Sequence, residues 1–458
     1  MVNTVESSKS TGDISDTLGP NTSALFHITR VEIDGFWGQY RASTKLHPDV
    51  NIIIGRNGSG KTTFINLLQG ALRVDLRILT TLDFKSIAIT LRSKRGRRII
   101  TVSKNVSEIV FQIGSQSFTL PIDPRFVYDE PLFGVRRHAL PARMGEAVSE
   151  LRVQIGSLIN IASLSVHRGA SEAVYVDEEP FSRRRIQRPA IDQRLEDLVQ
   201  QLTRYQLELT NEAGKVSSNF QHDVLVSMLY NKDFDTFDPR DAQNADIGEG
   251  REELAKAYRD LGVFDSIVSK RIDEHIAALR ESAITLRDTL FSPGEANEAA
   301  VDRGQQLIDS IMPFPLLKRT QYIINLSLQT QSKRQQIFQP VERFVKILGE
   351  FIDDKEVGIF NGELTIRKDG KRIPIDDLSS GEKQLLILLI ETLLQKEEPF
   401  VFLADEPELS LHVEWQAKVI SSIKILNPRS QVIVATHSPE IAGGWKGKII
   451  DMEDIIHA

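Results

Sequence analysis

The chain has 458 residues, enough for one large domain with an insertion or for about two to three domains. Its 41% hydrophobic and 26% charged residues exclude a mainly disordered, fibrous or membrane-embedded protein, and its net charge of -7 excludes one that binds nucleic acid through bulk positive charge. The lack of cysteine excludes disulfides, thiolate metal sites and cysteine nucleophiles; since no apolar run approaches the ~18 residues that span a bilayer, we expect a soluble, cytoplasmic protein.

The N-terminal third predicts a strand–loop–helix unit followed by a small antiparallel sheet. Residues 1–24 are rich in Ser, Thr, Asp and Gly, without the order of a signal peptide, and we expect a disordered tail. Residues 25–175 then form a first predicted lobe. Its elements in chain order are strands within 25–40 and 50–54, a helix from 61, antiparallel strands within 83–128, a helix over 143–157 and a strand over 160–166.

A polar segment without strand patterning, residues 176–350, is predicted to be a helical insertion. Apolar side chains recur at three- and four-residue spacing from Leu195 to Leu209, which is typical of a helix that packs along a partner helix. The pattern covers little more than two heptads. We therefore expect helices of about 25 residues and ~38 Å, which form a short coiled-coil-like arm.

Residues 351–458 return to strand patterning and form the second predicted lobe. Strands are expected over 364–367 and 373–375, with a turn between them. Two near-continuous apolar runs follow, Phe400–Ala404 and Val432–Ala435, and such runs are typical of central parallel strands that are covered on both faces. The chain is therefore predicted to have an α/β fold with an antiparallel β subdomain.

The segment 55–62, GRNGSGKT, fits the pattern of a phosphate-binding loop between a strand and a helix. The glycines let backbone N–H groups close around phosphates, and the helix N-terminus adds a favourable potential. We expect Lys61 to reach the β and γ phosphates of a nucleotide and the Thr62 hydroxyl to ligate magnesium. The predicted nucleotide-binding residues here are Arg56, Asn57, Gly58, Ser59, Gly60, Lys61, Thr62 and Thr63.

An acidic pair, Asp405 and Glu406, directly follows the first apolar run. One interpretation is an ordinary loop cap, and the other, which the phosphate loop favours, is the acidic pair of an ATPase. In that interpretation Asp405 holds magnesium through water. Glu406 orients and deprotonates the attacking water, a role that needs a carboxylate within hydrogen-bond reach.

The segment 379–384, SSGEKQ, begins with residues that cap a helix and thereby create an anion site at its N-terminus. It resembles the signature motif of ATP-binding-cassette (ABC) ATPases. In that family the motif contacts the γ-phosphate of a nucleotide held by the opposite subunit. The resemblance implies that Ser379, Ser380, Gly381 and Glu382 bind the nucleotide of a partner chain.

Two further segments appear in the order that this family shows. His437 follows the second apolar run and resembles the family's switch histidine, a donor to the γ-phosphate, although a lone histidine is more often structural. Residues 407–412 resemble the loop that crosses the dimer interface. The resemblance implies a P-loop NTPase of the ABC ATPase head type, with paired heads, which binds ATP and Mg2+ and hydrolyses ATP with Glu406 and His437 as catalytic residues.

The long insertion before the signature resembles the chromosome-maintenance (SMC), RecF and overcoming-lysogenization-defect (OLD) branch rather than transporters. The resemblance covers roughly residues 26–175 and 355–450. Stand-alone ATPases of bacterial anti-phage systems such as PARIS or Septu are similar. OLD nucleases carry a nuclease domain after the ATPase, whereas no second carboxylate cluster follows His437 here, so we expect no nuclease centre in this chain.

The sequence leaves the roles of three groups of residues open. The family's glutamine loop corresponds either to Gln154 or to the segment His167-Arg168. Three aromatic residues between the first two strands either border the adenine or pack in the core: Phe36, Trp37 and Tyr40. Two basic clusters are either solvated faces or contacts for nucleic acid or an acidic partner: Arg92, Lys94, Arg95, Arg97 and Arg98, and Arg183, Arg184, Arg185 and Arg188.

These patterns lead to one main hypothesis and two alternatives. The main hypothesis is an ATPase that acts as sensor or scaffold of a bacterial anti-phage defence system, with a phage-derived trigger and a separate, nuclease-like effector protein. The first alternative is a RecF-like DNA-repair ATPase. The second is an assembly module that binds ATP with negligible turnover.

Overall fold

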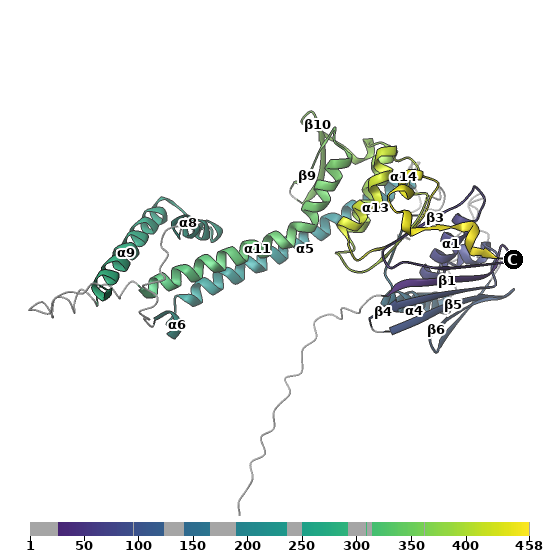
Figure 1. Cartoon of the computed structure of the whole chain (residues 1–458), viewed down its shortest axis with the longest axis horizontal. Helices are drawn as coiled ribbons and strands as arrows, with labels where there is room; N and C mark the ends of the chain where they lie inside the picture. Colours follow the sequence, from purple (N-terminus) through teal and green to yellow (C-terminus); the bar gives the residue numbers. More distant parts are fainter. Residues whose placement is uncertain are drawn as a thin grey trace, which may run out of the picture. The chain divides into compact units, whose positions relative to one another are not determined.

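A computed structural model describes residues 26–94, 96–122, 142–164, 189–235, 250–291, 308, 314–360 and 362–457. The chain groups into two compact units, which are described separately here (Figure 1). The head unit comprises residues 1–194 and 378–458, and the arm unit comprises 195–377. Several predictions fall outside the described residues, namely the tail 1–24, His167, Arg168, Arg95, Arg183, Arg184, Arg185 and Arg188.

The centre of the head unit is a five-stranded parallel sheet with the order β14-β3-β13-β12-β8. The two apolar runs form β12 and β13, whose side chains are almost entirely buried, which confirms that they are central strands. The strands are β3 (Val50–Ile54), β8 (Ile161–Leu164), β12 (Val401–Asp405), β13 (Gln431–Ala435) and β14 (Ile449–Asp451).

The predicted antiparallel subdomain is confirmed as a seven-stranded sheet with the order β15-β2-β1-β4-β5-β6-β7. Buried Gln431 of β13 joins the two sheets, because its side chain accepts a hydrogen bond from Ile28 N (2.8 Å) and donates to Ile28 O (2.7 Å). The strands are β1 (His27–Phe36), β2 (Tyr40–Lys45), β4 (Ser86–Ser93), β5 (Gly96–Lys104), β6 (Glu108–Ile113), β7 (Gln116–Pro121) and β15 (Ile456–His457).

Helix α1 lies between the two sheets, where it contacts β12 and β13 on one side and β4 on the other. Apolar side chains of α1, α4 and both sheets form one continuous core. The helix predicted over 143–157 is confirmed as α4. The head helices are α1 (Lys61–Arg73), α2 (Leu76–Thr81), α4 (Ala142–Leu158), α12 (Ser380–Leu393), α13 (Val413–Leu426), α14 (Pro439–Gly443), α15 (Met452–Ile455) and the short 3-10 helix η2 (Lys446–Lys448).

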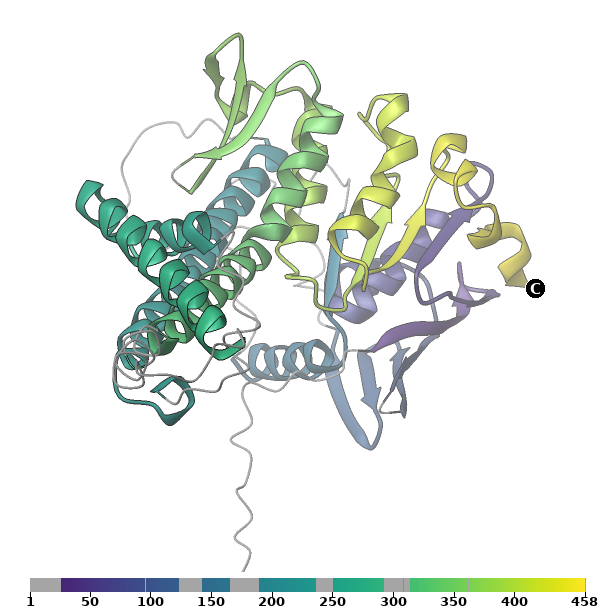
Figure 2. The same ribbon diagram turned by 60° about the vertical axis from the view of Figure 1, so that its left-hand side comes forward.

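The arm unit is built on two helices, α5 and α11, which run side by side (Figure 2). A separate apolar core, with Phe220, Leu254 and Ile276 among its members, joins α5, α8, α9 and α11. The elements are α5 (Ala190–Ser227, whose first turn belongs to the head unit), α6 (Lys232–Asp235), α8 (Gly250–Asp260), α9 (Ser266–Phe291), α11 (Phe314–Phe351), β9 (Glu356–Phe360), β10 (Glu363–Lys368), β11 (Lys371–Ile373) and the 3-10 helix η1 (Ile375–Asp377).

The predicted helix length of about 25 residues is wrong. Helices α5 and α11 have 38 residues each, or about 57 Å at 1.5 Å per residue. The buried face of α5 continues past Leu209 through Ala213 and Phe220 to Val224, but a four-residue step at Ala213 breaks the regular spacing. No helix among the described residues combines the length and the apolar composition that crossing a bilayer requires.

The strand predicted over 373–375 is also partly wrong. Strand β11 ends at Ile373, and Ile375 begins η1. Pro374 lies between them and has no N–H group to donate to a strand ladder, so the sheet stops there. The strand predicted over 364–367 is confirmed within β10, which pairs with β9 and β11 in a three-stranded antiparallel sheet.

Candidate active site

The phosphate loop connects β3 to α1, as its sequence pattern requires. Gly60, the residue before α1, has a φ of 97°, in the region that glycine adopts without strain. A Cβ atom there would lie 2.8 Å from the ring of Trp37 and 2.9 Å from that of Phe36, so only glycine fits. The tip of the β1–β2 hairpin therefore packs directly on the loop.

The three aromatic residues of that hairpin have different environments. Phe36 is fully buried in the core, whereas Trp37 is 42% exposed beside the loop. The Trp37 ring centroid lies 4.9 Å from that of Phe36 and 6.4 Å from that of Tyr40. Core packing thus accounts for Phe36, and Trp37 is the partly exposed member that also lies against the phosphate loop at Gly60.

Lys61, the first residue of α1, is 4% exposed, and its Nζ donates to Gly55 O (2.9 Å) and Arg56 O (3.1 Å). Burial lowers the pKa of Lys61, and four carboxylates oppose this effect: Glu406, Asp405, Glu408 and Asp451. The ammonium group therefore lies among negative charges that favour its charged form. Asp405 and Glu406 lie at the end of β12, two strands from β3 in the same sheet, so their charges act on Lys61 although about 340 residues separate them in sequence.

Glu406 and His437 follow two neighbouring parallel strands, in which Asp405 of β12 pairs with Ala435 of β13. The Glu406 backbone has a φ of 47°, uncommon for a non-glycine residue, and its N–H donates to Ala435 O (2.8 Å). This geometry leaves the Glu406 carboxylate 3.6 Å from His437 Nε2. Both side chains are about one-third exposed and can reach a bound molecule.

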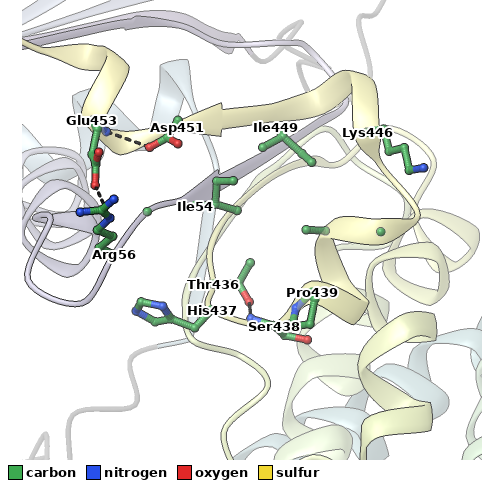
Figure 3. Close-up of a pocket in the computed structure, with 13 residues that line it drawn as sticks. Ile54, Arg56, Thr436, His437, Ser438, Pro439, Lys446, Ile449, Asp451 and Glu453 are labelled. Atoms are coloured by element: carbon green, nitrogen blue, oxygen red, sulfur yellow. Dashed lines mark hydrogen bonds and ion pairs between the residues drawn. The ribbon is translucent and has the colours of Figure 1, made fainter.

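An open cavity of about 630 Å³ lies beside the phosphate loop at the carboxyl ends of β3, β13 and β14. His437 and its neighbours Thr436 and Ser438 line one side, Ile449 of β14 lies across from them, and Arg56 and Glu453 lie at one end (Figure 3). The exposed Arg56 side chain forms an ion pair with Glu453 at 3.6 Å. The cavity therefore opens next to both the phosphate loop and the histidine.

Sequence reasoning missed Glu408, which joins the two loops of the site. Its Oε1 accepts hydrogen bonds from Thr436 Oγ1 (2.5 Å), His437 N (2.9 Å) and Ser438 N (3.2 Å). The sequence shows only an acidic residue in the segment 407–412, assigned there to an interface loop. No spacing rule points to its partners, because they lie 28 to 30 residues away.

The segment 379–384 begins α12 with a capping box. Ser379 Oγ accepts from Glu382 N (3.3 Å), and the Glu382 carboxylate accepts from Ser379 N (2.8 Å). A Cβ atom on Gly381 would lie 2.4 Å from Ser410 O, so glycine is needed for this close approach. Ser379 and Ser380 are exposed at the helix N-terminus, and Gln384 Nε2 donates to Pro407 O (3.2 Å).

The side chains of Thr62 and Asp405 can bind magnesium only together with further ligands. Thr62 and Asp405 offer hydroxyl and carboxylate oxygens, the ligand type that magnesium prefers. Among the residues that the structure describes, no cluster of three or more His, Cys, Asp or Glu side chains is arranged to hold a metal ion by itself. An ion here would need further oxygen ligands, such as nucleotide phosphates.

Comparison with known proteins gives curated relatives, two of which are described here. The chain is 24% identical over 218 residues to the Retron Vc95 probable ATPase of Vibrio cholerae serotype O1 biovar El Tor, covering 44% of this chain and 40% of the relative. It is 32% identical over 92 residues to the Septu protein PtuA of Bacillus thuringiensis, covering 17% and 23%. The chain thus spans less than half the length of either relative.

Structural comparison gives the Smc head domain from Pyrococcus furiosus, with 13% identity, a TM-score of 0.42 and 93% coverage of both chains. The family model described as AAA ATPase domain (AAA_15) matches residues 27–442, which include the phosphate loop, the acidic pair and His437. The two sheets of the head unit confirm the predicted α/β fold with an antiparallel subdomain, and the family match confirms the predicted resemblance to an ATPase of this kind. The chain belongs to the AAA ATPase domain family AAA_15.

Proposed function

We propose that this protein is an ATP-hydrolysing sensor or scaffold of a bacterial anti-phage defence system that works with a separate, nuclease-like effector protein. The family match supports the ATPase part. The names of two relatives, a retron ATPase and a Septu protein, support the defence part. The trigger in this proposal is a phage-derived molecule, and the heads work in pairs.

One observation carries the ATPase proposal: Lys61, the pair Asp405-Glu406 and His437 converge at the carboxyl edge of one parallel sheet. In open α/β sheets this edge is where ligands bind. The loop residues from Arg56 to Thr63 would surround the phosphates of ATP, with Lys61 as the buried cation. Trp37 is the aromatic residue best placed to border the base.

Each remaining site residue has one proposed role. Thr62 and Asp405 would hold Mg2+, which when bound neutralises charge on the phosphates. Glu406 takes the proton of the attacking water, and His437, 3.6 Å from it, donates to the γ-phosphate oxygen. Ser379, Ser380, Gly381 and Glu382 would complete the site of a partner head, since the N-terminus of α12 favours an anion.

Two assays with matched variants test this proposal. ATP turnover is measured for the wild type, for Lys61→Ala and for Lys371→Ala, an exposed lysine of β11 that serves as control. Plaque formation is then scored in bacteria that express each form of the protein together with the gene that lies next to its own in the genome, as the candidate effector. We expect turnover and phage protection in the wild type and the control only. Lack of turnover in the wild type would overturn the hydrolytic role, and protection by Lys61→Ala equal to that of the wild type would overturn the ATP-dependent defence role.

A further inference from the structure

We propose that Glu408 is a positioning residue that holds His437 in register with Glu406. The inference rests on the proposed catalytic roles of Glu406 and His437. Glu408 itself is not assigned to touch the nucleotide. It acts through the backbone of the loop that carries the histidine.

Three consecutive residues donate to one oxygen of Glu408. These donors are the Thr436 hydroxyl and the backbone N–H groups of His437 and Ser438, at 2.5, 2.9 and 3.2 Å. Hydrogen bonds to an ionised carboxylate are roughly twice as strong as neutral ones. Since one bond is to the amide of His437 itself, the histidine backbone cannot move away without breaking it.

The Glu408 backbone is itself fixed in a compact turn. Leu409 N donates to Glu406 O (3.1 Å), and Leu411 N donates to Glu408 O (2.8 Å). On the other side of the turn, Gln384 of α12 donates to Pro407 O (3.2 Å). Glu408 therefore belongs to a turn that begins with Glu406 and is hydrogen-bonded to α12. Through this turn and its bond to the His437 amide, Glu408 connects the two proposed catalytic residues.

The His437 side chain needs such support because little else holds it. It is 37% exposed and lies on the rim of the cavity (Figure 3). Ser438, by contrast, is also held by Thr436 Oγ1 (2.9 Å) and by Gln416 (2.7 Å). The bond from the His437 amide to Glu408 thus fixes the residue whose side chain is the least packed of the three.

A neutral glutamine side chain could accept the same three hydrogen bonds without burying a charge. The second oxygen of Glu408, Oε2, is buried and has no hydrogen-bond partner among the described residues. Keeping such a charged oxygen away from water is unfavourable. The carboxylate also adds negative potential at Lys61, next to the proposed phosphate site.

The test measures kcat and KM for ATP in Glu408→Ala and in the isosteric Glu408→Gln, with Glu440→Gln as control. Glu440 is an exposed glutamate of α14, three residues from His437. We expect Glu408→Ala to lower kcat by about 10- to 100-fold, because a misplaced catalytic group is costly. We expect Glu408→Gln to lower it by about 3- to 10-fold, because the amide oxygen still accepts hydrogen bonds. KM should change less than kcat, because the hydrogen bonds of Glu408 go to the loop that carries His437.

A double-mutant cycle with His437→Ala separates positioning from general loss of structure. If Glu408 acts through His437, adding either Glu408 variant to His437→Ala should lower the residual rate by less than about twofold. The same loss in both backgrounds, or wild-type kcat in both Glu408 variants, would overturn the inference. If Glu408→Ala fails to fold, the Glu408→Gln cycle decides by the same criteria.

The cycle also distinguishes this inference from the proposed function. A wild-type rate in His437→Ala would remove the proposed role of the histidine, and this inference with it. A large loss in His437→Ala alongside an unchanged rate in Glu408→Ala would overturn the positioning role alone and leave the proposed catalytic site intact.

Discussion

The head and arm units differ in how strictly local contacts determine which residue can occupy a position. In the head, Gly60 and Gly381 are required by close contacts, and Lys61, Glu406 and His437 converge at one sheet edge. The arm core is a cluster of apolar side chains at helical spacing, and such a core tolerates other apolar residues of similar volume. A substitution of similar size should therefore reduce ATP binding or hydrolysis when it is made in the head site, and should reduce the stability of the arm when it is made in the arm core.

The largest expected effect is in the head. Replacing Lys61 with Ala should abolish nucleotide binding, because the loop has no other buried cation to face the β and γ phosphates. Binding of a labelled ATP analogue measures this, with exposed Lys371→Ala as the control. Wild-type affinity in Lys61→Ala would contradict the assignment of the phosphate loop.

Next in size is the loss of the proposed general base. Glu406→Gln keeps the shape of the side chain but cannot take a proton, so hydrolysis should slow by about 100- to 10,000-fold while ATP binding persists. Single-turnover measurements with labelled ATP separate the two steps. An ATP-bound assembly should accumulate, and an unchanged hydrolysis rate would assign the base elsewhere.

A mixing experiment sharpens the contrast between residues that serve their own head and residues that serve a partner. Lys61→Ala and Ser380→Arg chains should each be inactive alone, because one lacks the loop cation and the other blocks the N-terminus of α12. Mixed under subunit exchange, they should regain partial ATPase activity, since one composite site then has both parts intact. If exchange is verified and neither activity nor nucleotide-dependent dimerisation returns, the site belongs to one chain.

The arm should respond in stability instead. Phe220 is 3% exposed in the arm core, and Phe220→Ala should destabilise that unit by about 3–5 kcal/mol. Hydrogen exchange in α8 and α9 measures this loss, with Leu225→Ala, 69% exposed in the same helix, as the control. ATP binding by the head should stay the same. Equal loss of ATP binding and arm protection would show that the two units do not differ in this way.

The smallest effect concerns Glu391 of α12, which pairs with Arg194 of α5 within the head unit. Burial raises the pKa of Glu391 despite this arginine. The folded chain therefore keeps a proton that the unfolded chain loses, and rising pH above about 4.5 weakens folding through this group. Relative to Glu391→Gln, the urea midpoint of the wild type should fall as the pH rises above about 4.5. Parallel pH profiles would contradict this shift.

Much of the candidate site could be predicted because its chemistry demands fixed residue types at fixed spacing. The loop 55–62, the pair Asp405-Glu406 and His437 each occur beside a readable strand or helix signal, and the structure has those elements at the expected positions. Glu408 could not be found in this way. Its three donors come from another loop, so its role depends on two parallel strands lying side by side.

The sequence alone determined the α/β class, the antiparallel subdomain and the order of the motifs, because local periodicity and turn chemistry act over a few residues. Tertiary structure decided what depends on distant contacts. It fixed the 38-residue length of α5, where a four-residue step at Ala213 breaks the regular spacing of the buried side chains. It also fixed the need for glycine at 381, which arises only because Ser410 O lies so close. It also decided how Gln431 joins two sheets across about 400 residues of sequence, because such hydrogen bonds leave no periodic trace in the chain.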